Sequence, residues 1–131
     1  MVPRSVDEQI IRARQEAIVV FRLGMKASSV GVHRTLNRPP KGKGWVQCIN
    51  MPAGMMCRPA KVREAIEHYK KSYEIFPDIV VLNQIALSYE MLGELETARE
   101  YLTRMKEQAE RENNSAYLQG AEVSLERARK Q

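Results

Sequence analysis

The sequence is poor in the features that mark secreted, membrane-spanning or disulfide-stapled proteins. It contains only two cysteines in 131 residues, Cys48 and Cys57, which gives no basis for a disulfide framework. It has no run of eighteen apolar residues, so no transmembrane span is predicted. The longest apolar stretch near the N-terminus, Ala17 to Phe21, is too short for the core of a signal peptide. We therefore expect a cytoplasmic protein.

The sequence also lacks the motifs on which many enzymes depend. Its two histidines, His33 and His68, fall in different predicted elements. No candidate nucleophile lies in a recognisable nucleophile-elbow motif. Lys41-Gly42-Lys43-Gly44 has neither the spacing nor the Ser or Thr of a phosphate-binding Walker motif. Carboxylates are numerous, but pairs such as Glu67 and Lys71 have the i,i+4 spacing of ion pairs on a helix surface. We predict no catalytic residue and no enzymatic activity.

Sulfur-containing residues cluster in the middle of the chain without a recognised metal-binding spacing. Thiolate and thioether groups select Cu(I), and Cys48 and Cys57 lie near His33 and several methionines, namely Met51, Met55 and Met56. The Cys-x8-Cys spacing matches no zinc ribbon, and one histidine with two cysteines leaves a tetrahedral site short of ligands. Methionines more often cover an apolar patch, so we predict no metal site and no cofactor. A disulfide is geometrically possible in a hairpin but is not expected in the cytoplasm.

The chain has enough apolar residues for one modest hydrophobic core, and its charged residues are distributed very unevenly. Its length and its 44% of hydrophobic residues are those of a single soluble domain. From Ala17 to Arg63 there is no Asp or Glu, while nine of the 21 bases lie there. The other 12 bases share the rest of the chain with all 16 acids. The protein is thus a mildly acidic body with a strongly basic middle.

The first segment, residues 1–28, is predicted to form one amphipathic helix. Ser5-Val6-Asp7-Glu8 fits a capping box, in which the Ser and Glu side chains satisfy backbone N–H groups of the first turn. Apolar residues then recur at three- and four-residue steps, at Val6, Ile10, Ala13, Ala17, Phe21, and Leu23 or Gly24. We expect this helix to fade near Lys26 to Ser28.

The second segment, residues 29–58, is expected to be an irregular basic insertion. Glycine and proline occur there too often for a helix of normal length, at Gly31, Pro39, Pro40, Gly42, Gly44, Pro52 and Gly54. The alternative is a short hairpin with strands at 45–49 and 55–57. A loop of about thirty residues inside a compact domain is unusual, and is expected to be either functional or disordered.

The third segment, residues 59–131, is predicted to form four helices. The first of them begins at Pro59 and ends before Pro77, and the next is capped by Asp78 and stopped by Gly93. A third covers about 94–110, and the last follows a break at 113–115. The residues expected to face inward are Val62, Ala65, Ile66, Tyr69, Ser72, Tyr73, Phe76, Val81, Leu82, Ile85, Ala86, Tyr89, Leu92, Leu95, Ala98, Tyr101, Leu102, Met105, Tyr117, Leu118, Ala121, Val123, Leu125 and Ala128.

Small and aromatic residues recur in these helices with a nearly regular period. Ala65 and Ala98 are 33 residues apart, and Gly120 falls where the next small residue belongs. The residues of the pattern are Ala65, Tyr69, Ser72 and Pro77 in one unit, and Ala86, Tyr89, Gly93, Ala98 and Leu102 in the next. This pattern resembles the tetratricopeptide repeat (TPR), a helix–turn–helix unit of about 34 residues. Ser72, Met105 and Glu110 depart from it, because the family usually has Ala, Ala and Pro there.

The resemblance implies an all-α fold of antiparallel helix hairpins, stacked as a short right-handed superhelix. It would comprise about two repeats and a C-terminal capping helix that shields the end of the stack. The N-terminal helix would supply the first helix of repeat one, and the basic stretch would be an insertion into the turn of that repeat. An unrelated five-helix bundle is the alternative.

The resemblance also implies a groove, lined by the first helix of each repeat, that binds an extended or helical segment of another protein. The matching positions are Asn83, Gln84, Leu87, Glu90 and Met91, with Arg14, Gln15, Ile18 and Arg22 on the N-terminal helix. Asn83 and Gln84 would equally suit a solvated surface. A clamp for a C-terminal carboxylate is not expected, because Gln84 replaces the family's Asn and the matching bases are missing. The leading hypothesis is a non-enzymatic adaptor or assembly factor.

The basic segment suggests an alternative function. Four bases, Arg34, Arg38, Lys41 and Lys43, lie close in sequence to Trp45. A cationic loop with an aromatic residue can neutralise phosphates and stack on a base, which suits RNA or a ribonucleoprotein. An acidic protein surface, an anionic membrane face or a solvated loop would fit these residues equally well. Self-association through Tyr73, Phe76 and the methionine-rich stretch is a third possibility.

Overall fold

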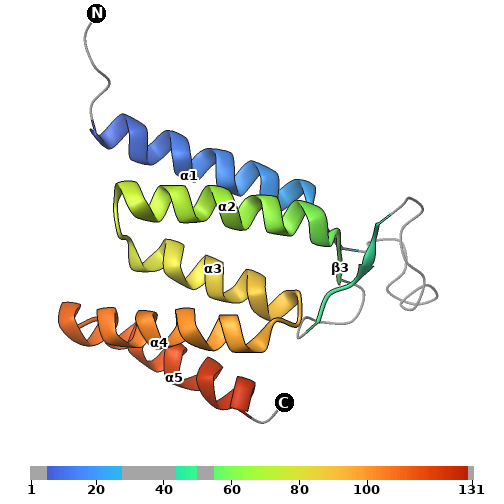
Figure 1. Ribbon diagram of the computed structural model, residues 1–131. Helices are drawn as coiled ribbons and strands as arrows, with labels where there is room; N and C mark the ends of the chain where they lie inside the picture. Colours follow the sequence, from blue (N-terminus) through green and yellow to red (C-terminus); the bar gives the residue numbers. More distant parts are fainter. Residues whose placement is uncertain (1–5, 28–43, 50–54, 130–131) are drawn as a thin grey trace, which may run out of the picture.

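The computed structural model describes residues 6–27, 44–49 and 55–129, and most of these lie in α-helices (Figure 1). The helices are α1 (Val6–Leu23), α2 (Pro59–Ile75), α3 (Ile79–Met91), α4 (Leu95–Glu112) and α5 (Ser115–Arg129). Three short strands lie between α1 and α2 in the chain: β1 (Met25–Ala27), β2 (Val46–Gln47) and β3 (Met55–Cys57). The predicted all-α class is confirmed, with a small sheet added to it.

The five helices form a layered stack in sequence order. Each helix runs opposite to the helix before it, and each packs against the next along the chain (Figure 1). The sheet lies at one end of the stack, beside the end of α1 and the beginning of α2 (Figure 1). From α2 onward, short connections between helices force this order, because a turn of a few residues can only join antiparallel neighbours.

Helix boundaries between residues 59 and 129 follow local signals that the sequence shows. Pro59 is the first residue of α2, where its missing N–H costs nothing. Asp78 precedes α3, and its side chain accepts a hydrogen bond from the Val80 N–H at 2.9 Å. Gly93 and Asn113 follow α3 and α4 with φ of 78° and 54°, the left-handed conformation that ends a helix. The predicted helix boundaries there are confirmed to within about two residues.

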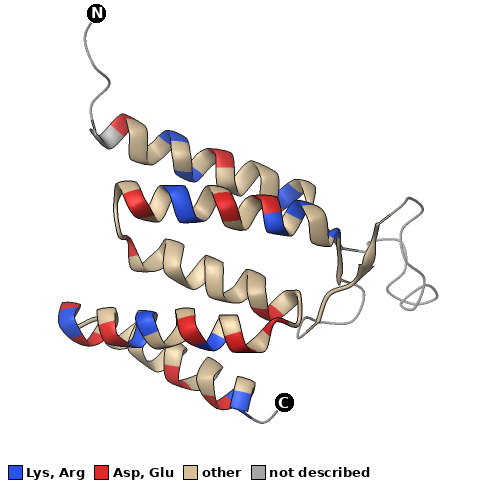
Figure 2. Cartoon of the chain, in the orientation of Figure 1, with Lys and Arg blue, Asp and Glu red and all other residues tan. Residues whose placement is uncertain are grey.

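Helix α3 is shared by two hydrophobic clusters. Val81 and Ile85 belong to a cluster with α1, α2 and the sheet, and Leu82 and Ala86 belong to a second one with α4 and α5. All four side chains are fully buried. Lys and Arg are absent from α3, whereas they occur on α1, α2 and α4 around it (Figure 2). A helix that is apolar on most sides is typical of the centre of a stack.

Two residues predicted to face inward are exposed. Phe76 is 48% exposed because it is the C-cap of α2 and has an extended backbone, so its side chain leaves the apolar stripe. Val123 is 57% exposed because α5 is the last helix of the stack. One face of α5 packs on α4 through residues such as Ala121, and among the described residues no further helix covers the other face.

The N-terminal helix ends earlier than predicted. It stops at Leu23, and the chain continues directly into strand β1 instead of fading as helix to Ser28. Gly24 makes this possible: a Cβ there would lie 2.8 Å from the Cβ of Lys61, so only glycine lets the chain pass α2 so closely. Its carbonyl then accepts a hydrogen bond from the Arg58 N–H at 2.8 Å. Ser5 of the predicted capping box lies outside the described residues.

The basic insertion contains the hairpin that was considered as the alternative to a loop. Strand β3 is central, with β1 and β2 antiparallel on either side of it. Cys57 faces Met25 on β1 and Val46 on β2. The hairpin docks on the helices where α3 ends, because the Ile49 N–H donates to the Met91 carbonyl at 3.1 Å. Residues 44–49 and 55–57 of the insertion therefore contribute to the core and cover one end of the stack.

Candidate binding groove

A groove lies between α1 and α3, with α2 as its floor. Both helices pack against α2 but make little contact with each other, which leaves space between them. The groove has a volume of about 300 Å³, at the lower end of the range for ligand sites. Its lining residues are Arg14, Ile18, Phe21 and Arg22 from α1, Tyr69 from α2, and Val80, Val81 and Gln84 from α3.

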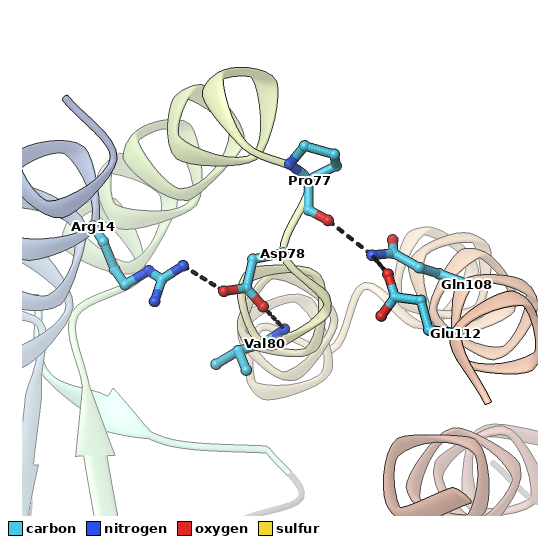
Figure 3. Close-up of polar contacts among 6 residues, drawn as sticks. All are labelled: Arg14, Pro77, Asp78, Val80, Gln108 and Glu112. Carbon is cyan, nitrogen blue, oxygen red and sulfur yellow. Dashed lines mark hydrogen bonds and ion pairs between the residues drawn. The ribbon is translucent and has the colours of Figure 1, made fainter. Parts of the chain in front are cut away.

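One end of the groove is fixed by an ion pair between its two walls. Arg14 of α1 donates to the Asp78 carboxylate at 2.5 Å, and the other oxygen of that carboxylate caps α3 at Val80 (Figure 3). A carboxylate at this position also interacts favourably with the positive end of the helix dipole. The same carboxylate therefore starts α3 and ties that helix to α1.

The turn between α2 and α3 is held from the other side by α4. Gln108 is buried and donates to the Pro77 carbonyl at 2.8 Å and to the Glu112 carboxylate at 2.9 Å (Figure 3). Its own side-chain oxygen accepts a hydrogen bond from the Tyr73 hydroxyl at 2.8 Å. A buried amide with these partners is well satisfied, so it fixes the turn. The start of α3 is thus anchored on both sides.

The floor of the groove is apolar and neutral. Phe21 and Tyr69 meet edge to face with ring centroids 6.3 Å apart. Burial raises the pKa of Tyr69 above its usual value, although the charge on Arg22 acts in the opposite direction. The phenol therefore stays protonated at neutral pH. The lining residues include no carboxylate, thiol or imidazole, so they offer contact surface and hydrogen bonds rather than acid–base groups.

The structure brings together four residues that the sequence placed in a groove. Arg14, Ile18, Arg22 and Gln84 all line the cavity. Gln15, which was assigned to the same register, is exposed on α1 beside them. Two further predicted residues, Asn83 and Leu87, are partly exposed on α3 and do not line the cavity.

Glu90 and Met91 were predicted to face a partner, and both are buried. The Glu90 side chain is only 3% exposed, because Arg127 of α5 donates to its carboxylate at 2.8 Å. Met91 lies in the core cluster with Cys48 of the hairpin, whose next residue hydrogen-bonds to the Met91 carbonyl. The α3 surface is therefore available near the start of the helix and covered near its end.

The predicted basic loop lies largely outside the described residues. Arg34, Arg38, Lys41 and Lys43 are in that part of the chain, and only Trp45 is described. Trp45 is half-buried, and the Arg58 guanidinium lies over its ring at 5.4 Å from the centroid. A cation at this distance is attracted by the ring, so one aromatic face already has a partner within the protein.

Four lining residues were not predicted as part of the groove. Phe21, Tyr69 and Val81 were assigned to inward-facing apolar stripes, and Val80 was not assigned at all. Their apolar character predicts that they are buried, but it does not predict that one side of them borders an open groove. The groove depends on the distance between α1 and α3, which no local sequence pattern specifies.

No family model matches the chain, and no curated protein and no solved structure matches it either. Within residues 6–27, 44–49 and 55–129, none of the helices combines the length and apolarity needed to cross a bilayer.

Proposed function

We propose that this protein is a non-enzymatic adaptor or assembly factor that holds a segment of a partner protein in the groove between α1 and α3. The observation that carries the proposal is the groove itself, which has an apolar floor and two arginines and a glutamine among its lining residues. A concave, mostly apolar surface with a few polar groups is typical of binding sites.

The helix arrangement supports the TPR-like interpretation as part of this proposal. Ala65, Ala86 and Ala98, the small residues of the repeat pattern, are all fully buried. Small residues at these positions let neighbouring helices approach closely, which is their role in stacked repeats. In this interpretation α1 with α2 and α3 with α4 are the two repeats, and α5 is the capping helix.

The groove chemistry indicates a partner segment with an apolar side chain next to an acidic one. Ile18, Phe21 and Val80 offer apolar contact to a side chain that enters the cavity. Arg22 is exposed and has no carboxylate within ion-pair distance among the described residues, unlike Arg14, which is paired with Asp78.

A displayed library of random peptides, selected on the whole protein, tests the proposal. We expect enriched peptides to share an apolar residue beside Asp or Glu, with affinities reduced at least tenfold by Ile18→Asp and by Arg22→Glu. The matched control is Val123→Asp, which places the same charge at an exposed apolar position on α5, far from the groove. Peptides that bind the Ile18→Asp variant as tightly as the wild type would contradict the groove assignment.

Binding of RNA or a ribonucleoprotein through the basic loop stays an alternative proposal. Fluorescence anisotropy with a single-stranded RNA at two salt concentrations tests it, because binding to phosphates weakens steeply as salt rises. The variant is a fourfold alanine substitution of Arg34, Arg38, Lys41 and Lys43. Equal RNA binding by this variant and the wild type would exclude the loop as the anchor.

A further inference from the structure

The small sheet gathers sulfur-containing side chains on one of its faces. Met25 lies directly opposite Cys57, and the Cys48 N–H donates to the Met55 carbonyl at 3.0 Å, so Cys48 continues β2 opposite Met55. Directly opposed residues of neighbouring strands share a face, and so do residues two apart along one strand. The strand register therefore places Met25, Cys48, Met55 and Cys57 on the same side.

A fifth sulfur comes from α3. Met91 belongs to the same core cluster as both cysteines and is held next to Cys48 by the hydrogen bond from Ile49. Cys48, Cys57 and Met91 are 3%, 1% and 2% exposed, and both thiols are free. Met25 and Met55 pack against this cluster but stay partly exposed, so they lie between the buried sulfurs and solvent.

The two cysteines lie on neighbouring strands. Cys57 pairs with Val46, which is two residues before Cys48 along the same strand direction, so both thiols are on the same face of the sheet. Both belong to one hydrophobic cluster and are shielded from water, so with the nearby thioethers they form a set of soft donors.

The donor set decides which ion would fit. Among the described residues, no group of three or more His, Cys, Asp or Glu side chains lies close enough to hold a metal ion. Zn²⁺ in structural sites takes four ligands from those residue types, so it would find too few here. Cu(I) prefers thiolate and thioether sulfur and accepts a low coordination number. We propose that Cys48 and Cys57, with Met91 as a thioether ligand, bind one Cu(I) ion.

Binding would replace protons by the metal without any change of oxidation state. Each S–H bond breaks as an S–Cu bond forms, and the two protons pass to solvent. The copper enters as Cu(I), so no electron is transferred and no oxidant is required. The partly exposed Met25 and Met55 provide a sulfur-lined route from the surface. The ion would fasten the hairpin to the end of α3.

Anaerobic titration of the whole reduced protein with Cu(I), in competition with a chromophoric Cu(I) chelator, tests this proposal. We expect the wild type to retain one Cu(I) per chain. Cys48→Ala and Cys57→Ala should each lower the affinity for Cu(I). The loss should exceed the roughly ten- to hundredfold loss of affinity that follows removal of an outer-shell partner of a metal ligand. Met91→Leu should weaken it less than either. The matched control is Met105→Leu, a buried methionine of the other cluster, which should bind as the wild type does.

X-ray absorption at the copper edge gives a second readout that does not depend on the folding of any variant. A first shell of sulfur alone is expected for the loaded wild type. Nitrogen or oxygen in that shell, or a wild type that holds no more Cu(I) than Cys48→Ala, would overturn the assignment.

Discussion

The two ends of α3 differ in what covers them. Its first half contributes Val80, Val81 and Gln84 to a groove that has nothing over it among the described residues. Its second half is covered twice, by the hairpin over Met91 and by Arg127 of α5 over Glu90. The packing of α1 and α3 on α2 leaves a groove along the first half of α3, and the hairpin with the last helix covers the second half.

The largest effect is expected at the covered end of α3. Arg127→Ala would remove an ion pair and two hydrogen bonds from the buried Glu90 carboxylate, and should lower the free energy of unfolding by about 3 kcal/mol. This is the low end for a broken buried pair, because Arg127 itself is 45% exposed. Urea unfolding followed by circular dichroism measures it. Arg129→Ala, which removes an exposed pair with Glu126, is the control, and an equal effect of the two would refute the distinction.

A smaller effect is expected from the buried thiol of the hairpin as the pH rises. Below about pH 9 Cys48 is protonated in both folded and unfolded chains, so it contributes no pH dependence. Above that pH the unfolded chain loses the proton first, since the folded pKa is about 12. The free energy of unfolding should then fall by about 1.4 kcal/mol per pH unit on account of this group.

Urea unfolding at pH 8, 9 and 10 checks this slope. Other groups titrate in the same range, including Tyr69, so the comparison is with Cys48→Ala, which keeps them and removes the thiol. The variant should lose less stability between pH 9 and 10 than the wild type does. Identical slopes would mean that the thiol is ionised as easily in the folded protein as in the unfolded chain.

The smallest effect is expected at the open end. Arg14→Ala removes the ion pair between α1 and α3 but leaves Asp78 as the cap of α3, so the loss of stability should be at most about 1 kcal/mol. Arg12→Ala, whose pair with Glu16 is exposed, should change stability by less than this. Unfolding in urea compares the two. A loss at Arg14 as large as that at Arg127 would mean that both ends of α3 are held equally firmly.

The helices could be predicted from the sequence because their signals are local. Asp78, Gly93 and the proline at 59 each act on the turn in which they stand, and the structure uses all three. The sheet depends on contacts between distant residues: Met25 pairs with Cys57, and nothing in the sequence around Met25 indicates a partner so far along the chain. For that reason β1 was missed, and the hairpin was only an alternative.

The groove could be predicted in part for a similar reason. Arg14, Arg22 and Gln84 were assigned to the groove from the register of the repeat that the chain resembles, and the structure places them together. Glu90 was assigned from the same register, but its burial is decided by Arg127, 37 residues later in the chain. Sequence periodicity identifies the face of a helix. It does not identify what the last helix of the stack will cover.

Val81 and Ile85 belong to one hydrophobic cluster, and Leu82 and Ala86 belong to the other. Unfolding of α3 would therefore disrupt both clusters. The backbone amides of this helix should therefore exchange with deuterium only through opening of the whole molecule, in a single cooperative event. A peptide seated against Gln84 would then slow exchange throughout the chain, including in α5, which it does not touch.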